Sequence, residues 1–321
     1  MSLPLPDWEG PQPLELAALA HPTNLTAYHI GRHPRLFAVT VVAYLIIISG
    51  LMILHGDSIE PEWLALALML AAVALGAGKR FLKDWTPFVV LVLAYEAMRG
   101  LAAHSNFQPH DVGGLELWLW GGHLPTVTLQ RLFYNPNTVG IQDKIATTVY
   151  FAHFLLPVGF GFMLWLSSRE AYFRFTSSLL MLAFLAFLTY LLWPSSPPWF
   201  AHPAEVHKIM TEAMSKGGLA RAASPIYSLF NPNRFAAFPS LHSAFPSLVA
   251  IHAWRRRRWL GVTLAAWTLV VWVCVVYLGE HYTVDALAGL AYAISATIVV
   301  DQVVAHRTKQ PGLALASPRI S

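Results

Sequence analysis

Apolar runs long enough to cross a bilayer are the feature that most constrains the fold of this 321-residue chain. A helix needs about 20 apolar residues to cross about 30 Å of hydrocarbon. The candidate spans cover residues 36–53, 63–78, 86–103, 146–166, 176–193, 239–254, 259–278 and 284–304. Only 12% of the residues are charged, about half the share in a soluble domain. The sequence therefore predicts an all-α, polytopic membrane bundle of about eight transmembrane helices.

The charges between the apolar runs predict how the chain is threaded through the membrane. Acidic residues follow the first run, whereas basic residues follow the second, fourth, sixth and eighth runs. These basic residues are Lys79, Arg80, Lys83, Arg169, Arg174, Arg255, Arg256, Arg257, Arg258, Arg307 and Lys309. Because basic loops tend to stay in the cytoplasm, we expect both termini there and the segments 104–145 and 194–238 outside. Short basic loops are ordinary topology signals, so we expect no nucleic-acid partner.

Two short motifs at the edges of apolar runs carry candidate chemistry on the outer face. Residues 279–285 read Gly-Glu-His-Tyr-Thr-Val-Asp, which places His281 four residues before Asp285. A neutral imidazole is a competent nucleophile near pH 7, and a carboxylate on its second nitrogen fixes the tautomer. If a helix begins near Tyr282, Asp285 lies in its first turn and faces back toward His281. The alternative is an interfacial histidine beside a helix-capping aspartate.

The second motif, residues 238–242, reads Phe-Pro-Ser-Leu-His and supplies a second imidazole. Pro239 and Ser240 are typical of a helix start, where backbone N–H groups can bind a phosphate oxygen. His242 can then serve as the general acid for the leaving oxygen of a phosphoester. A capped helix with an interfacial histidine is the alternative. Because both motifs fall on one predicted face, we favour chemistry on a lipid phosphoester, with Ser240 and Tyr282 as candidate substrate contacts.

The two motifs resemble Pro-Ser-x-His and His-x-x-x-Asp, the second and third motifs of the type 2 phosphatidic acid phosphatase superfamily. The resemblance covers about the last six spans and implies a six-helix core. It also implies that His281 is the nucleophile, Asp285 its partner and His242 the acid and base. No cofactor or metal is implied. A zinc site is the other interpretation of these residues, but Zn²⁺ needs three or four converging ligands.

Departures from the phosphatase pattern point to one branch of that superfamily. The chain has no Arg-Pro dipeptide, and Cys274 and Val275 stand where the phosphatases have Ser-Arg. Residues 193–199 instead read Trp-Pro-Ser-Ser-Pro-Pro-Trp. This resembles the Pro-Pro-Trp signature of the inositol phosphorylceramide synthase branch, which moves a phospho-head group between lipids. The resemblance makes Trp199 a candidate substrate contact.

The missing arginines leave open which cation holds the phosphate. Arg234 is the first candidate, and Arg221 and Lys216 in the same outer segment are weaker ones. Arg99 lies near the outer end of the third span and can reach a phosphate, although an ion pair with Glu96 is favoured because intramembrane charges usually pair.

Two further polar residues lie within the spans. His153 can assist the site from the outer half of its span, although a hydrogen bond to a neighbouring carbonyl is favoured. His252, at the inner end of its span, is too far from the outer face to take part.

The expected division of the chain follows from these assignments. We expect a cytoplasmic segment 1–35, two peripheral transmembrane helices 36–84, a catalytic membrane domain 85–306 and a disordered cytoplasmic tail 307–321. The segment 114–133, with few charges and two tryptophans, is expected to lie along the interface or to be re-entrant.

We predict a lipid phosphotransferase with a phosphohistidine intermediate, acting on a phospholipid or lipid phosphate in the membrane. Possible donors are inositol phospholipids and other glycerophospholipids, and possible acceptors are ceramide, diacylglycerol and a polyprenol. A phosphatase that uses water as the acceptor is the second hypothesis. A non-catalytic lipid-binding or transport protein is the third. The sequence leaves the oligomeric state open.

Overall fold

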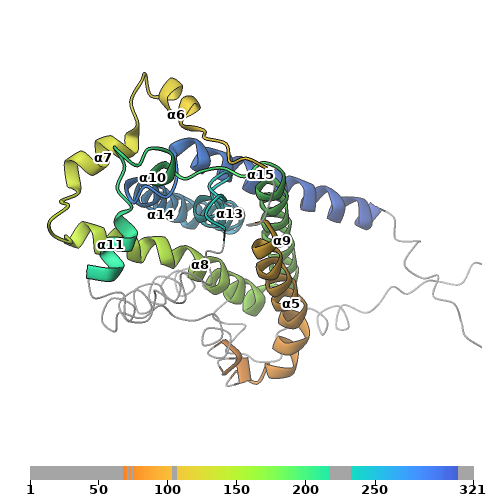
Figure 1. The fold of residues 1–321 in the computed structure, drawn as a ribbon. Helices are drawn as coiled ribbons and strands as arrows, with labels where there is room; N and C mark the ends of the chain where they lie inside the picture. The colour runs from red at the N-terminus through yellow and green to blue at the C-terminus, as the bar shows by residue number, and fades with distance from the viewer. Residues whose placement is uncertain (1–67, 71, 74, 103–106, 217–232, 310–321) are drawn as a thin grey trace, which may run out of the picture.

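The computed structural model describes residues 68–309, except for 71, 74, 103–106 and 217–232 (Figure 1). Its long helices are α5 (Gly78–Ala102), α8 (Ile141–Ser167), α9 (Arg169–Leu192), α13 (Leu241–Arg256), α14 (Arg258–Tyr277) and α15 (Thr283–Lys309). The short helices are α6 (Gly113–Leu119), α7 (Pro125–Phe133), α10 (Pro198–Ala201) and α11 (Ile209–Lys216). The predicted all-α bundle is confirmed. The count of eight transmembrane helices stays a prediction, because the first run and residues 63–67, 71 and 74 of the second lie outside the described residues.

Within the described ranges, three helices are long and apolar enough to cross a membrane: α9, α14 and the Thr283–His306 part of α15. A fourth span results if the two parts of α8, Ile141–His153 and Leu155–Ser167, are taken together across their 41° bend. Pro157 lies just after this bend. A proline ring crowds the carbonyl four residues earlier and cannot donate to it, which accounts for a bend at this place.

The helices agree with the predicted runs except at the start of α5. The runs from 146 onward correspond to α8, α9, α13, α14 and α15. The run 86–103, however, continues backward through Lys83, Arg80 and Lys79, which lie inside α5 instead of in a loop. The Arg80 guanidinium donates a hydrogen bond to the Trp165 carbonyl (2.8 Å) and lies over the Trp165 ring. This contact gives the basic residue a partner on α8 and lets the helix extend.

Helix α13 is the centre of the bundle. It packs against α8, α9, α14 and α15, and Figure 1 shows it beside α14 in the middle of the molecule. Most of its side chains are buried, including Leu248, Val249 and Ala253. Helix α13 has only 16 residues, fewer than a lipid-facing span needs. Because other helices cover most of its surface, this shorter helix can still lie within the bundle.

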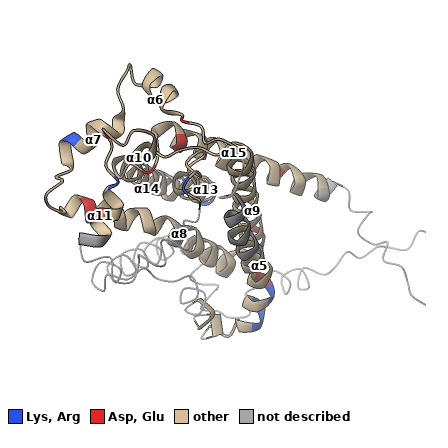
Figure 2. Cartoon of the chain, in the orientation of Figure 1, with Lys and Arg blue, Asp and Glu red and all other residues tan. Residues whose placement is uncertain are grey.

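Ion pairs hold the basic end of the bundle together. Arg169 of α9 contacts Asp84 of α5 at 2.6 Å, and Asp301 of α15 pairs with both Arg174 and Arg255 (3.4 and 2.7 Å). Figure 2 shows the basic start of α5 far from α6 and α10. The basic clusters and the histidine motifs therefore lie at opposite ends of the helices, as expected. Which end faces the cytoplasm stays a prediction.

The segment between α5 and α8 forms two short helices with an apolar outer surface. Trp118 is 77% exposed and Leu132 is 69% exposed. Helices of 7 and 9 residues are too short to enter and leave the bilayer. This favours the interfacial arrangement over the re-entrant one.

A glycine permits the close approach of α15 to the start of α13. A Cβ atom added at Gly289 would lie 2.5 Å from the carbonyl oxygen of Ser240 and 3.2 Å from the backbone nitrogen of Ala244. Beside this contact, the backbone N–H of Ser240 donates to the carbonyl of Asp285 at 3.0 Å. The absence of a side chain at Gly289 thus allows the two predicted motifs to approach each other.

Replacing Gly289 by alanine should therefore push α15 away from α13. We expect Gly289→Ala to lower the free energy of unfolding by about 1 to 3 kcal/mol, as overpacking usually does. Thermal unfolding in detergent would measure this. Gly114→Ala is the matched control, because nothing lies within 4 Å of a Cβ at Gly114. Equal melting temperatures for both variants would contradict the close packing.

Candidate active site

Two imidazoles from the two motifs meet at one end of the bundle. His242 lies in the first turn of α13, and His281 lies in the short connection between α14 and α15. The Nδ1 atom of His242 is 3.0 Å from the Nε2 atom of His281. His281 is 4% exposed, whereas His242 is half-buried. The predicted convergence of the two motifs is therefore present.

The surroundings of His281 fix its tautomer. Its Nδ1 atom lies 2.9 Å from the carbonyl oxygen of Ala237 and 3.5 Å from Oδ2 of Asp285. Both are acceptors, so Nδ1 must carry the proton and donate it to the Ala237 carbonyl. The Nε2 atom of the neutral ring then has the lone pair and accepts a hydrogen bond from Nδ1 of His242. The nitrogen that faces the second histidine therefore carries the lone pair that a nucleophile needs.

Asp285 occupies the predicted place but is the more distant of the two acceptors. It is fully buried in the first turn of α15, where its Oδ2 atom accepts the backbone N–H of Tyr282 at 2.8 Å. Its other oxygen, Oδ1, has no hydrogen-bond partner among the described residues. The Ala237 carbonyl orients the imidazole more directly. No sequence signal identifies that group, because every residue has a carbonyl.

Ser240 holds the start of α13 as the N-cap. Its hydroxyl oxygen accepts the backbone N–H of Ser243 at 3.3 Å, which satisfies one free donor of the helix start. The hydroxyl of Tyr190 on α9 donates to the carbonyl of Pro239 at 2.6 Å. With the Asp285 carbonyl of α15, which accepts the Ser240 N–H, contacts from α9, α13 and α15 fix the segment that precedes His242. The predicted contact of Ser240 with substrate stays a prediction.

The segment 193–199 holds the strand-like residues before α13. The Ser195 hydroxyl oxygen accepts the backbone N–H of Phe238 at 2.6 Å, and the Ser195 N–H donates to the carbonyl of Phe235 at 2.8 Å. Isolated bridges join Ser195 to Ala236 on one side and to His110 on the other. This fully buried serine therefore fixes the backbone that presents the Ala237 carbonyl to His281.

Trp199 contacts the connection that carries His281. Its indole N–H donates to Oε2 of Glu280 at 3.2 Å, and its backbone N–H donates to the carbonyl of Gly279 at 3.1 Å. The Lys208 ammonium lies 4.0 Å from the centre of its ring. Burial raises the pKa of the Glu280 carboxyl above its ordinary range, although Lys208 and His281 oppose this. Trp199 thus positions the loop beside His281, and its predicted contact with substrate stays a prediction.

Two rings on α8 pack against His242. Tyr150 stacks on it and His153 lies tilted against it, each with 4.0 Å between ring centres. His153 also hydrogen-bonds to the Tyr150 carbonyl, the bond favoured from the sequence. Both rings restrict the motion of His242. His252 lies buried ten residues further along α13, about 15 Å away by helical rise.

A buried glutamate caps the helix that carries Asp285. Glu116 of α6 accepts the backbone N–H groups of Thr283 and Val284, both at 3.0 Å, and the Thr283 hydroxyl at 2.8 Å. Its charge also complements the positive end of the α15 dipole. Sequence reasoning missed Glu116, because the residues that it caps are 167 and 168 positions away.

The remaining predicted residues are dispersed. Tyr282 is fully buried, and its hydroxyl donates to Oδ1 of Asp111 at 2.8 Å. Arg234 is exposed in the segment before α13. The side chains of Arg99 and Lys216, and all of Arg221, lie outside the described residues. Their roles, and the identity of the cation that holds phosphate, stay predictions.

Comparison with known proteins identifies the class. Residues 127–299 match the model of the PAP2 superfamily, and the chain belongs to this family. It is an integral-membrane lipid phosphotransferase or phosphatase. It is 27% identical over 222 residues to the phosphoinositol dihydroceramide synthase of Bacteroides thetaiotaomicron, covering 65% of this chain and 72% of the relative.

A second relative is the inositol phosphorylceramide synthase catalytic subunit of Schizosaccharomyces pombe. The identity is 28% over 206 residues, or 55% of this chain and 46% of the relative. The chain thus spans less than half the length of the yeast protein. These relatives support the inositol phosphorylceramide synthase-like branch. No solved structure matches the chain.

The indole of Trp199 can be tested as a support of the site. Trp199→Phe removes the donor to a buried carboxylate, so we expect it to lower the free energy of unfolding by about 1 to 3 kcal/mol. Trp118→Phe is the matched control, because Trp118 is 77% exposed. Denaturation of both variants in the same detergent measures the difference. Equal free energies of unfolding for the two variants would show that the Trp199 indole does not stabilise the site.

The raised pKa of Glu280 predicts a pH dependence of stability. The folded carboxyl keeps its proton to a higher pH than the unfolded one, so the folded state binds more protons between the two pKa values. Stability should therefore fall as the pH rises from about 4 toward the folded pKa. Glu280→Gln should flatten this fall, and Glu205→Gln, on an exposed carboxylate, should not. Unfolding midpoints measured across this pH range would show the difference, and parallel curves would refute it.

Proposed function

We propose that this protein transfers a phosphoinositol head group from an inositol phospholipid to a ceramide-type acceptor. The observation that carries the proposal is the contact of His242 with the Nε2 atom of His281, whose other nitrogen is held by the Ala237 carbonyl beside Asp285. The names of the two relatives, both synthases of inositol-phosphorylated ceramides, support this donor and acceptor.

In the first step, Nε2 of His281 attacks the donor phosphorus and the bond from phosphorus to the diacylglycerol oxygen breaks. His242, protonated at the start of this step, gives its proton to that oxygen. The buried Asp285 carboxylate stabilises the positive charge that develops on His281. The product is diacylglycerol, and the phosphoinositol group remains on His281.

In the second step, the neutral His242 accepts the proton of the ceramide hydroxyl while the hydroxyl oxygen attacks phosphorus. The bond from phosphorus to Nε2 breaks and His281 returns to its neutral form. Two displacements of this kind give ping-pong kinetics. At 3.0 Å the two imidazoles touch each other, so they must move apart when the phosphate enters between them.

The extracytoplasmic position of the site is part of the proposal. It is supported by the separation of the histidine motifs from the basic residues around Arg169 and Arg255, which lie at the other end of the bundle.

The proposal can be tested with purified protein in mixed micelles that contain head-group-labelled phosphatidylinositol. We expect label on ceramide only when ceramide is added, no product from His281→Ala, and a loss of about two to four orders of magnitude in His242→Ala. His123→Ala, an exposed histidine outside the site, is the matched control. Water-soluble labelled product that is indifferent to ceramide would make the protein a phosphatase-type hydrolase. Equal activity in His281→Ala would remove the proposed nucleophile.

A further inference from the structure

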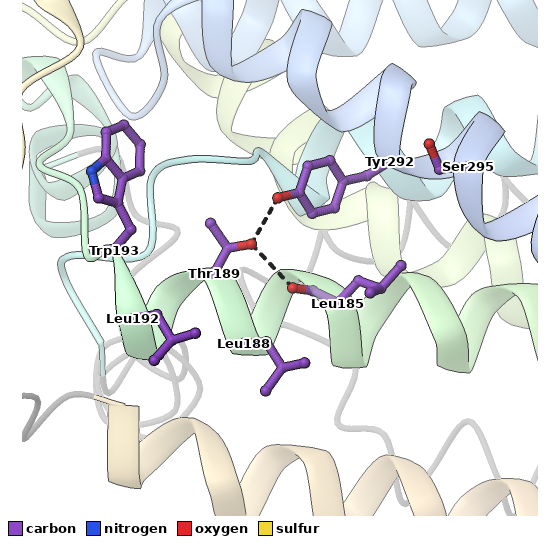
Figure 3. Close-up of a pocket in the computed structure, with 7 residues that line it drawn as sticks. All are labelled: Leu185, Leu188, Thr189, Leu192, Trp193, Tyr292 and Ser295. Carbon is purple, nitrogen blue, oxygen red and sulfur yellow. Dashed lines mark hydrogen bonds between the residues drawn. The ribbon is translucent and has the colours of Figure 1, made fainter.

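A groove of about 450 Å³ runs between α9 and α15, within the size range of ligand sites. Its lining residues are Leu185, Leu188, Thr189, Leu192, Trp193, Tyr292 and Ser295 (Figure 3). The lining is mostly apolar, and Leu188 and Leu192 are about half exposed. Both helices are long and apolar enough to cross a membrane, and a groove between two such spans faces the hydrocarbon layer. Its surroundings favour an apolar chain.

The groove lies beside elements that also carry the candidate active site. Tyr292 is seven residues after Asp285, so both lie on the same face of α15, about 10 Å apart along the helix. At the upper end of the groove, the Trp193 ring contacts Phe238 edge-on with 5.2 Å between ring centres. Phe238 begins the motif that ends at His242. A lipid with its head at the histidines can therefore place a chain in the groove.

One polar feature lies in this apolar groove. Thr189 donates a hydrogen bond to the Leu185 carbonyl at 3.1 Å, and its oxygen is 2.7 Å from the Tyr292 hydroxyl oxygen (Figure 3). Since the single Thr189 proton points to the carbonyl, the Tyr292 hydroxyl donates to Thr189. The Tyr292 oxygen can then still accept a hydrogen bond from a ligand, but it has no further proton to donate. This pair therefore suits a lipid that offers a hydrogen-bond donor.

We propose that the groove holds a hydrocarbon chain of the acceptor lipid, and that Tyr292 accepts a hydrogen bond from the amide or hydroxyl of its backbone. A ceramide has both donors, whereas the ester groups of a glycerophospholipid only accept. The inference rests on the proposed transfer and assigns one subsite within it. A lipid chain in the bilayer is already out of water, so the hydrophobic effect does not favour its entry into the groove. Selection of the acceptor lipid therefore depends on packing in the groove and on the hydrogen bond to Tyr292.

Photo-crosslinking tests occupancy without requiring turnover. Benzoylphenylalanine in place of Leu188, in the His281→Ala protein, should capture an alkyne-tagged ceramide, and untagged ceramide should compete better than phosphatidylinositol. The same probe in place of Ile294, an exposed apolar residue of α15 outside the groove, should capture little. Three results would overturn the proposal: equal capture at both positions, competition by phosphatidylinositol alone, or a crosslink to residues 36–53 of the same chain. Specific capture of ceramide at position 188, with no phosphoinositol transfer by the wild-type protein, would support the subsite and refute the proposed function.

Enzyme assays test the hydrogen bond separately. The wild type should use ceramide about threefold to tenfold better than N-methylceramide, which lacks the amide donor. Tyr292→Phe should lose most of this preference while its kcat/KM for the donor lipid stays unchanged, because in a ping-pong reaction that ratio does not depend on the acceptor step. Leu188→Trp should raise the KM for long-chain ceramide more than for short-chain ceramide, and Ile294→Trp should change neither. An unchanged preference in Tyr292→Phe would show that this residue does not accept the hydrogen bond of the acceptor amide.

Discussion

The close contact between the start of α13 and the first turns of α15 is the constraint on which the site depends. Gly289 leaves no room for a side chain at this crossing, and the Ser240 N–H bonds to the Asp285 carbonyl beside it. This places His242 and His281 within hydrogen-bond distance although they are 39 residues apart. A small change in helix spacing would separate the two imidazoles.

Around this contact, the outer segments hold the backbone in place. Ser195 fixes the segment that presents the Ala237 carbonyl, Trp199 anchors the loop before His281, and Glu116 caps α15. Each uses a buried polar group with a defined partner, because an unsatisfied one is costly in such surroundings. The segment with the Pro-Pro-Trp sequence therefore supports the site through its backbone and indole contacts.

The proposed reaction and the proposed subsite use the same two helices. Asp285 lies in the first turn of α15 beside the histidines, and Tyr292, two turns further along α15, lines the groove between α15 and α9. The head group and the chain of one lipid would thus contact successive turns of one helix. Such an arrangement couples recognition of the acceptor chain to the position of its reactive hydroxyl.

The sequence by itself determined the all-α membrane bundle, the separation of basic residues from the histidine motifs, and the pairing of His281 with Asp285 near a helix start. These features depend on local composition and on spacings of a few residues, which a single sequence contains. Only the tertiary structure decided that the Ala237 carbonyl is the nearer acceptor for His281, that Glu116 caps α15, and that Tyr150 and His153 pack on His242. Those contacts join segments that are distant in the chain, or involve backbone atoms that every residue has, so no residue pattern specifies them.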